Sequence, residues 1–393
     1  MGKFNSLEIT QLLDRVNWDF EDYISSSYPE DINSLHWYPA SFVPQIPSIL
    51  IQIFSEKGKR VLDPFVGGGV TLIEAAKQNR AFIGVDFNPY AIEISKAKFE
   101  AINCNDWAWL DSFAEEVRQR NLIESPQHYC QRVGIKDEVF RWFHPQTLHE
   151  LLAIHSCIME VSNEFFLLKK VIFSSILKSC CSQRKHYTYI TDRCFPKKFV
   201  RVHAKEKYVR QFDLARRASR RFREYYERLN SKKWHGEIGQ IVVDDARDLS
   251  WINDEYVDLI VTSPPYLGCN DYIKSMRLTN LFFRLYEIRD LVAKEIGARC
   301  KRHRKSLQSE YLKDMMVSLN ECKRVLRKDG HLALVFGQGK GRARKFDIVQ
   351  FISKYIIEKL RFEAIFDTER NIMFHRIRFP GVKKEHIMVF RKL

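Results

Sequence analysis

The chain has no uninterrupted run of 18 apolar residues, and its most apolar stretch, Phe165 to Leu177, is broken by Lys169 and Lys170. Since a membrane-spanning helix needs about 20 consecutive apolar residues, no membrane span is expected. Glycine and proline are few, at 16 and 12 of 393 residues, which excludes collagen-like and low-complexity classes. With 45% hydrophobic residues, the chain can bury a large core.

Metal-ligand spacings are also missing, because the nine cysteines include no CxxC pair and no His/Cys ligand pattern. Because these spacings are missing, we expect no metal site. An odd number of cysteines fits a reducing compartment in which the thiols stay free. The first residues lack the apolar core of a secretion signal. We therefore expect a cytoplasmic location.

Acidic residues are scarce in one part of the chain. The net charge is +15, and the segment from Arg184 to Lys233 alone holds 17 Lys and Arg against 5 Asp and Glu. A solvated helix face explains most charge runs, but an excess this concentrated favours a polyanionic partner, with nucleic acid first. Neutralising several arginines between 210 and 223 is expected to flatten the salt dependence of DNA affinity.

The same basic segment carries a helical pattern of apolar residues. Their spacing alternates between four and three, which predicts one helix with an apolar seam, and the aromatic members are expected in the core rather than as platforms for stacked bases. A loop of basic residues further on is predicted to grip a phosphate backbone. The seam is Tyr208, Phe212, Ala215, Ser219, Phe222, Tyr226 and Leu229; the loop is Arg299, Lys301, Arg302, Arg304 and Lys305; Arg184, Lys185, His186, Tyr187 and Tyr189 are candidates to reach bases or to shape a loop.

Hydrophobic runs predict an α/β fold. Buried strands are expected at 61–63 and 81–86 with a helix at 72–78 between them, a βαβ unit that a helix at 89–101 follows. Residues 105–235 have helical patterns, and strand patterns resume at 240–243, 257–261, 331–336, 363–366 and 386–390. We therefore expect residues 1–104 to form the cofactor-binding half of one domain, 236–393 its catalytic half, and 105–235 a helical basic insertion for target recognition.

A glycine-rich turn, Asp63-Pro-Phe-Val-Gly-Gly-Gly-Val-Thr71, lies where the first strand meets the first helix, and Asp86 ends the next strand. Glycines let the backbone approach a ligand, and an acid at the second strand end can accept hydrogen bonds from both ribose hydroxyls. The turn does not match a Walker loop and matches the dinucleotide fingerprint poorly. The alternative to a ligand-binding turn is one whose glycines only let the chain reverse its direction. The combination predicts a nucleoside site.

This turn, followed by Phe82-Ile-Gly-Val-Asp86-Phe-Asn-Pro89, resembles the S-adenosylmethionine site of the amino-group DNA methyltransferases, the N4-cytosine and N6-adenine family. The stretch His36 to Pro44 is similar to the segment that holds the methionine end of the cofactor there. The resemblance implies S-adenosylmethionine as cofactor and a Rossmann-like class I methyltransferase sheet with helices on both faces. The implied cofactor-binding residues are Asp63, Phe65 and Gly67 at the methionine moiety, Asp86 at the ribose, Asp245 at the adenine amino group, and Tyr38, Pro39, Gly69, Thr71, Phe87 and Ala246 around them.

The catalytic half is expected where an apolar strand, Val257 to Thr262, runs into Ser263-Pro264-Pro265-Tyr266. Ligands of open α/β sheets bind outside the carboxyl ends of the strands, so this turn is expected to face the glycine-rich turn across one cavity. The alternative is that Pro-Pro-Tyr is bound by a small recognition domain of another protein. That role requires the motif to be exposed, whereas an apolar strand leads directly into it.

An exocyclic base amine is a poor nucleophile, and acceptors at its hydrogens favour a pyramidal nitrogen whose lone pair faces the methyl carbon. The Ser263 hydroxyl and the Pro264 carbonyl are our candidate acceptors. The two prolines stiffen the turn and remove backbone donors. By the resemblance, Tyr266 stacks on the base, which must first be extruded from the duplex.

The sequence is thus interpreted as a DNA methyltransferase that acts on double-stranded DNA. In the family that it resembles, serine at the first motif position usually accompanies N4-cytosine, so Ser263 favours cytosine, with Asn270, Asp271 and Tyr272 as secondary pocket residues. A restriction-modification role with a cognate restriction endonuclease follows from the resemblance alone. N6-adenine, an RNA amine and an inactive DNA-binding protein are the alternatives. The resemblance covers residues 36–100 and 240–340, and the insertion lies before Asp244 instead of directly before Ser263 as in the common arrangement.

Overall fold

The computed structural model describes residues 6–20, 30–41, 43–160, 164–183, 195–236, 239–284, 287–338, 346–372 and 384–393. The basic and aromatic residues between 184 and 189 that were candidates to reach bases lie outside these ranges. None of the helices in the described ranges has the length and apolar character that crossing a membrane requires.

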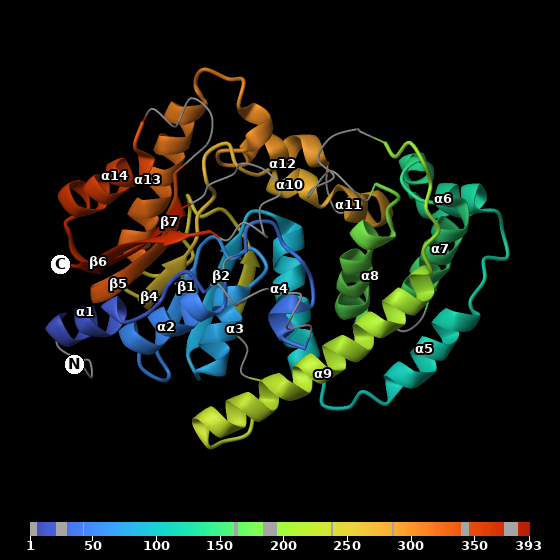
Figure 1. Ribbon diagram of the computed structural model, residues 1–393, viewed down its shortest axis with the longest axis horizontal. Helices are drawn as coiled ribbons and strands as arrows, with labels where there is room; N and C mark the ends of the chain where they lie inside the picture. Colours follow the sequence, from blue (N-terminus) through green and yellow to red (C-terminus); the bar gives the residue numbers. More distant parts are fainter. Residues whose placement is uncertain are drawn as a thin grey trace.

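One seven-stranded sheet organises the molecule (Figure 1). The strand order is β3-β2-β1-β4-β5-β7-β6, with β1 to β5 parallel and β7 inserted antiparallel between β5 and β6. We call the end of the sheet where the parallel strands stop its carboxyl end and the opposite end its amino end. The strands are β1 (Arg60–Asp63), β2 (Ala81–Asp86), β3 (Gln240–Val243), β4 (Val257–Thr262), β5 (Leu326–Gly337), β6 (Phe362–Asn371) and β7 (Lys384–Lys392).

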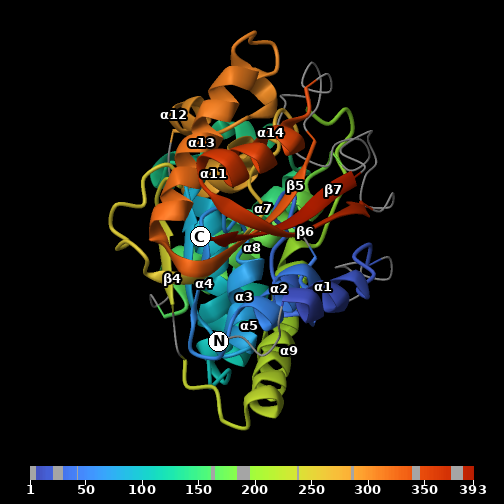
Figure 2. The same ribbon diagram turned by 90° about the vertical axis from the view of Figure 1, so that its left-hand side faces the viewer.

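Helices cover both faces of the sheet, as Figure 2 shows from the side. Successive side chains of a strand point to opposite faces, so Leu259 and Val261 of β4 join one core while Ile260 joins the other. The predicted α/β fold with helices on both faces is confirmed. The first core contains α2 (Gln45–Phe54), α3 (Val70–Lys77) and α4 (Pro89–Asn103), and the second contains α13 (Leu307–Val325) and α14 (Ile348–Lys354).

Short helices fill the remaining connections. Two of them precede β1, and the others connect the strands β4 to β6. They are α1 (Ser6–Asp14), η2 (Ile32–Ser34), α10 (Tyr272–Ser275), α11 (Arg277–Phe283), α12 (Ile288–Lys294), η4 (Arg299–Lys301) and the π-helix η6 (Tyr355–Lys359).

The predicted insertion is helical and packs on the sheet domain. Its aromatic and aliphatic side chains belong to the same hydrophobic core as α2, α3 and α4. Whether residues 105–235 form a separate recognition domain stays a prediction. The elements are α5 (Trp109–Gln119), α6 (Pro126–Val133), η3 (Asp137–Arg141), α7 (Pro145–Glu160), α8 (Phe166–Cys180) and α9 (Ala204–Asn230).

Helix α9 confirms the predicted seam, since its members are buried, apart from Leu229, which is 43% exposed. In Figure 1 the helix rises from the lower left to the right-hand side, and its C-terminal half lies away from α10 and α12 at the top. Near its end, Tyr226 donates a hydrogen bond to Asn79 Oδ1 at 3.1 Å, in the turn between α3 and β2. Because that turn precedes β2, this half of α9 lies at the amino end of the sheet.

Candidate active site

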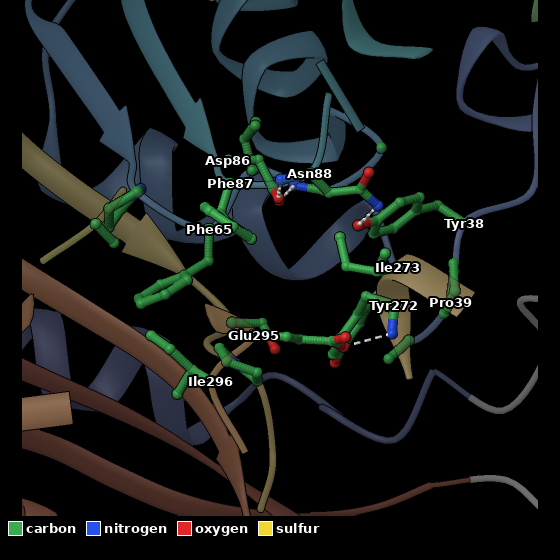
Figure 3. Close-up of a pocket in the computed structure, with 18 of the residues that line it drawn as sticks. Tyr38, Pro39, Phe65, Asp86, Phe87, Asn88, Tyr272, Ile273, Glu295 and Ile296 are labelled. Atoms are coloured by element: carbon green, nitrogen blue, oxygen red, sulfur yellow. Dashed lines mark hydrogen bonds between the residues drawn. The ribbon is translucent and has the colours of Figure 1, made fainter. Parts of the chain in front are cut away.

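The carboxyl ends of β1, β2 and β4 surround one hollow, shown in close-up in Figure 3. Gly67 from the turn after β1, Asp86 at the end of β2 and Ser263 after β4 all line it. The hollow contains about 830 Å³ of empty space, its open mouth included, within the roughly 300–1,000 Å³ of small-molecule sites. The two sequence motifs therefore open onto one cavity.

The glycine-rich turn is built for close packing. Gly67 has φ 49°, and a Cβ there would lie 3.0 Å from the Tyr38 ring. Gly69 has φ 81°, and a Cβ there would lie 2.7 Å from Ser95 Oγ. Both positions favour glycine because L side chains are strained at positive φ. Behind the turn, the buried Lys98 donates to the Gly68 carbonyl at 2.5 Å, and burial lowers the pKa of Lys98 to about 8.

Asp86 joins the turn to the end of β2. Its Oδ2 accepts a hydrogen bond from the Gly67 amide and its Oδ1 from the Asn88 amide, both at 2.8 Å. Burial raises the pKa of Asp86 to about 6 in spite of these bonds. Each carboxylate oxygen has a second lone pair, so Asp86 keeps acceptor capacity toward the hollow that it lines.

Asp63 and Thr71, expected at the cofactor, lie behind the hollow instead of lining it. Asp63 is 1% exposed, and its carboxylate accepts from the Thr71 and Thr262 hydroxyls at 2.6 Å each and from the Phe65 amide at 3.1 Å. These bonds tie the turn after β1 to the end of β4. Gly69 also lies outside the lining, because it packs on α4. The three residues shape the cavity from outside.

The segment before α2 brings Tyr38 and Pro39 to the wall of the hollow. The Tyr38 hydroxyl accepts a hydrogen bond from Asn88 Nδ2 at 3.2 Å. Upstream, His36 Nε2 lies 2.9 Å from the Ser174 hydroxyl of α8, which lies 2.5 Å from the Thr279 hydroxyl of α11. Burial lowers the pKa of His36 to about 3, so its imidazole is neutral and the link is structural.

Phe65, Phe87, Asp245 and Ala246 line the hollow as the sequence predicted. Asp245 already has a partner, since its two carboxylate oxygens accept from Arg247 at 2.9 and 2.6 Å. The same guanidinium donates to Asp314 at 3.0 Å. The loop after β3 is thus held to α13, and Asp245 offers a ligand only its remaining lone pairs.

The Ser-Pro-Pro-Tyr turn presents two of its four residues to the hollow, Ser263 and Pro265. The Pro265 carbonyl accepts a hydrogen bond from Tyr311 at 2.9 Å. Pro264 and Tyr266 are not among the lining residues. The Tyr266 ring packs edge-on against Phe336 of β5, and its hydroxyl donates to Glu385 Oε2 of β7 at 2.7 Å. A stacking role for Tyr266 stays a prediction.

A second wall of the hollow comes from α10 and from the residues after α12, as Figure 3 shows. Tyr272, expected as a secondary pocket residue, lines the hollow and stacks on Tyr38 at 6.1 Å between ring centroids. Asn270 and Asp271 are not in the lining; the Asp271 carboxylate accepts from the Cys300 amide at 2.7 Å.

Sequence reasoning missed Glu295, which lines the hollow although it is only 6% exposed. Its Oε1 accepts from the Tyr272 amide at 2.6 Å, while Oε2 is buried without a partner in the described structure. Burial raises the pKa of Glu295 to about 8. A glutamate between a helix and a basic loop gives no signal in sequence. Among the described residues, no cluster of three or more His, Cys, Asp or Glu could hold a metal ion.

The fold and this hollow define the class of protein, a Rossmann-like methyltransferase that uses S-adenosylmethionine. A family model described as DNA methylase, N6_N4_Mtase, matches residues 7–97 and 257–393, more than half of the chain. The chain belongs to this family of amino-group DNA methyltransferases.

Individual relatives are distant in sequence. The type II methyltransferase M.MjaII of Methanocaldococcus jannaschii is 20% identical over 83% of this chain and 76% of its own length. The type II methyltransferase M.MvaI of Kocuria varians is 22% identical over 65% of this chain and 59% of its own length. Among solved structures, the rRNA methyltransferase aviRa of Streptomyces viridochromogenes has a TM-score of 0.40 at 12% identity, with 99% of this chain and 96% of that chain covered.

The residues of the hollow fit S-adenosylmethionine. The ligand carries a sulfonium, an ammonium, ribose hydroxyls and an adenine amino group, all of which suit carboxylate oxygens. The hollow supplies the carboxylates of Asp86 and Asp245, together with the aromatic rings of Phe65 and Phe87, and Glu295 adds a carboxyl group. Within the described ranges the Asp86 carboxylate has no cationic partner, so it can pair with a cationic ligand.

Proposed function

We propose that the protein methylates the N4 amine of a cytosine that is flipped out of double-stranded DNA. The observation that carries the proposal is that Ser263 lines the same hollow as Gly67 and Asp86. A base and the cofactor can then meet in one cavity. Cytosine is preferred to adenine because serine is the first residue of the catalytic turn, as in the cytosine-specific enzymes that the sequence resembles.

We assign the cofactor half of the hollow as follows. Asp86 accepts hydrogen bonds from the ribose hydroxyls, and Phe87 and Ala246 contact the adenine, whose amino group donates to Asp245. Tyr38, Pro39, Phe65 and Gly67 surround the methionine end. The support is that all these side chains lie in one lining and that Asp86 retains acceptor capacity beyond its two backbone bonds.

In the catalytic half, Ser263 Oγ is the acceptor for a hydrogen of the target amine. Such a bond favours a pyramidal nitrogen with its lone pair free for attack. The bound cofactor supplies an electrophilic methyl group on a sulfonium. Pro264 and Pro265 hold Ser263 in a stiff turn, and the hydrogen bond from Tyr311 to the Pro265 carbonyl fixes that turn further. Positioning of this kind supplies a large part of the acceleration in a two-partner transfer.

The DNA is expected across the carboxyl end of the sheet, where the hollow opens. Residues 294–296 line the hollow, and the chain then continues into the exposed residues Arg302, Arg304 and Lys305. Phosphate contacts there would hold the duplex while a base enters, at a cost of roughly a few kcal/mol for unstacking.

Of the insertion, we assign to target recognition the stretch that follows α8. Lys178, near the end of α8, lies 4.7 Å over the Trp37 ring, next to the lining residue Tyr38. The stretch therefore starts beside the hollow. Its described part exposes Lys197, Lys198 and Phe199, with Phe199 at 48%. A restriction-modification role with a cognate endonuclease is part of the same proposal.

The test is direct. Purified protein is incubated with DNA and methyl-labelled cofactor, the DNA is digested to nucleosides, and the labelled nucleoside is identified by mass spectrometry. We expect N4-methylcytidine in its deoxy form. Labelled N6-methyladenine would overturn the base assignment and keep the family chemistry, whereas label only in RNA would overturn the substrate.

A further inference from the structure

The hydroxyl of Tyr266 belongs to a series of polar contacts that runs from the C-terminal strands β6 and β7 to Ser263 at the hollow. Arg370 of β6 donates to Glu385 Oε1 of β7 at 2.8 Å, and these side chains are only 4% and 8% exposed. Glu385 Oε2 accepts from the Tyr266 hydroxyl at 2.7 Å. The Tyr266 oxygen lies in turn 3.4 Å from Ser263 Oγ. Four side chains, from β6, β7 and the turn after β4, thus connect the two strands to the hollow.

The number of protons on each side chain decides which group donates and which accepts in these contacts. Glu385 forms an ion pair with Arg370 at 2.8 Å, and the carboxylate of such a pair only accepts hydrogen bonds. The single hydroxyl proton of Tyr266 has two acceptors within reach, Glu385 at 2.7 Å and the Val335 carbonyl at 3.3 Å, and the shorter contact directs it to Glu385. Burial and the negative charge of Glu385 raise the pKa of Tyr266 well above its usual value, so the phenol keeps this proton.

The contact between Ser263 and Tyr266 must then use the proton of Ser263. Because the Tyr266 hydroxyl donates its hydrogen bond to Glu385, the Tyr266 oxygen can act toward Ser263 only as an acceptor. Ser263 is therefore the donor at 3.4 Å, and its hydroxyl hydrogen points away from the hollow. The Ser263 lone pairs remain for a ligand in the hollow that Ser263 lines.

We propose that Arg370 and Glu385 are positioning residues that act through the Tyr266 hydroxyl to fix Ser263 as a hydrogen-bond acceptor. The proposal rests on the proposed function in one respect, that Ser263 faces the target amine. An unconstrained serine hydroxyl rotates freely and can donate its proton to the amine nitrogen, occupying the lone pair that must attack the methyl group. A hydroxyl that donates to Tyr266 populates that competing state less before the base arrives.

Tyr266→Phe tests this series of contacts, because it keeps the ring and removes only the hydroxyl. We expect the single-turnover rate of methyl transfer to fall about tenfold, the size of one hydrogen bond, with the dissociation constants of cofactor and DNA unchanged. Glu385→Gln, a weaker acceptor, should give a smaller decrease in the same parameter. An unchanged rate in both variants would overturn the proposal, as would an effect that appears in the dissociation constants alone.

Glu369→Gln is the matched control, because Glu369 also lies on β6, pairs with Lys384 and is 44% exposed. Its rate should equal that of the wild type. All rates are measured on the nucleoside that the wild type labels, so failure of the cytosine assignment is visible in the wild type alone. Thermal unfolding of each variant separates a folding defect from an effect on the rate; if Tyr266→Phe is unfolded, Glu385→Gln decides alone.

Discussion

Each end of the sheet carries a group of basic residues, and the two groups differ in how many of their side chains are paired within the protein. At the amino end, three arginines of α9 are paired within the protein: Arg223 donates to the Cys104 carbonyl at 2.8 Å, and Arg217 and Arg221 reach Glu30 at 3.0 and 2.8 Å. At the carboxyl end, Arg302, Arg304 and Lys305 are exposed and form no ion pair within the described part of the chain.

This difference shows why a high charge density does not by itself locate a nucleic-acid surface. These arginines of α9 cover backbone carbonyls and acidic side chains, so part of their positive charge is used to stabilise the fold. The smaller group beside the hollow has its charge free for phosphate. We therefore base the proposed DNA surface on the position of a basic group relative to the cavity and on its pairing, and not on its net charge.

The largest expected effect is on methyl transfer, when the hydroxyl oxygen of Ser263 at the carboxyl end is removed. Ser263→Ala removes the proposed acceptor for the amine, and we expect methyl transfer to fall by about 100-fold or more. Cofactor affinity should persist, because Ser263 is not among the proposed cofactor contacts. Single-turnover assays and calorimetry measure the two quantities separately. Full activity in this variant would remove Ser263 from the mechanism.

The next effect concerns DNA binding at the same end. Replacing Arg302, Arg304 and Lys305 together with Gln should weaken DNA binding and reduce the slope of log affinity against log salt by about one for each phosphate that is no longer neutralised. Cofactor affinity should be unchanged, since none of the three lines the hollow. Fluorescence anisotropy with a short duplex at several salt concentrations gives the slope. A slope equal to that of the wild type would place the DNA elsewhere.

Buried carboxyls that form no ion pair among the residues the structure describes are a further property of the carboxyl end, and they predict a pH dependence. The pKa of Glu295 is raised to about 8 by burial, against about 4.3 in an unfolded chain. The native state therefore holds an extra proton between these values, and stability decreases as the pH rises from about 4.5 to 8.

Glu295→Gln removes this decrease, because an amide does not titrate. Its unfolding temperature relative to the wild type should rise from about pH 5 to pH 9. The exposed Glu310 of α13 offers the control, since Glu310→Gln makes the same chemical change outside the hollow. Parallel curves for Glu295→Gln and the wild type would mean that Glu295 is ionised throughout.

Much of this carboxyl end could be predicted from sequence, because it depends on local patterns. The strands at 81–86 and 240–243 have the predicted bounds, and two turns after parallel strands must meet at one end of a sheet. Glu295 could not be predicted, since tertiary packing brings it to the hollow from a loop. The partners of Asp63 and the series of polar contacts from Arg370 to Ser263 depend on side-chain contacts between distant strands, which no spacing encodes.

The smallest effect is expected at the amino end, where sequence alone predicted a large one. Arg220→Gln and Arg221→Gln together remove two charges whose partners are Glu224 and Glu30. Because this part of α9 lies beside the turn between α3 and β2, remote from the hollow, we expect the salt slope of DNA affinity and the methylation rate to stay at wild-type values. Anisotropy under the conditions used for the carboxyl-end variant allows a direct comparison. A slope reduced by about two would show that the DNA also contacts α9, and the contrast between the two ends would then fail.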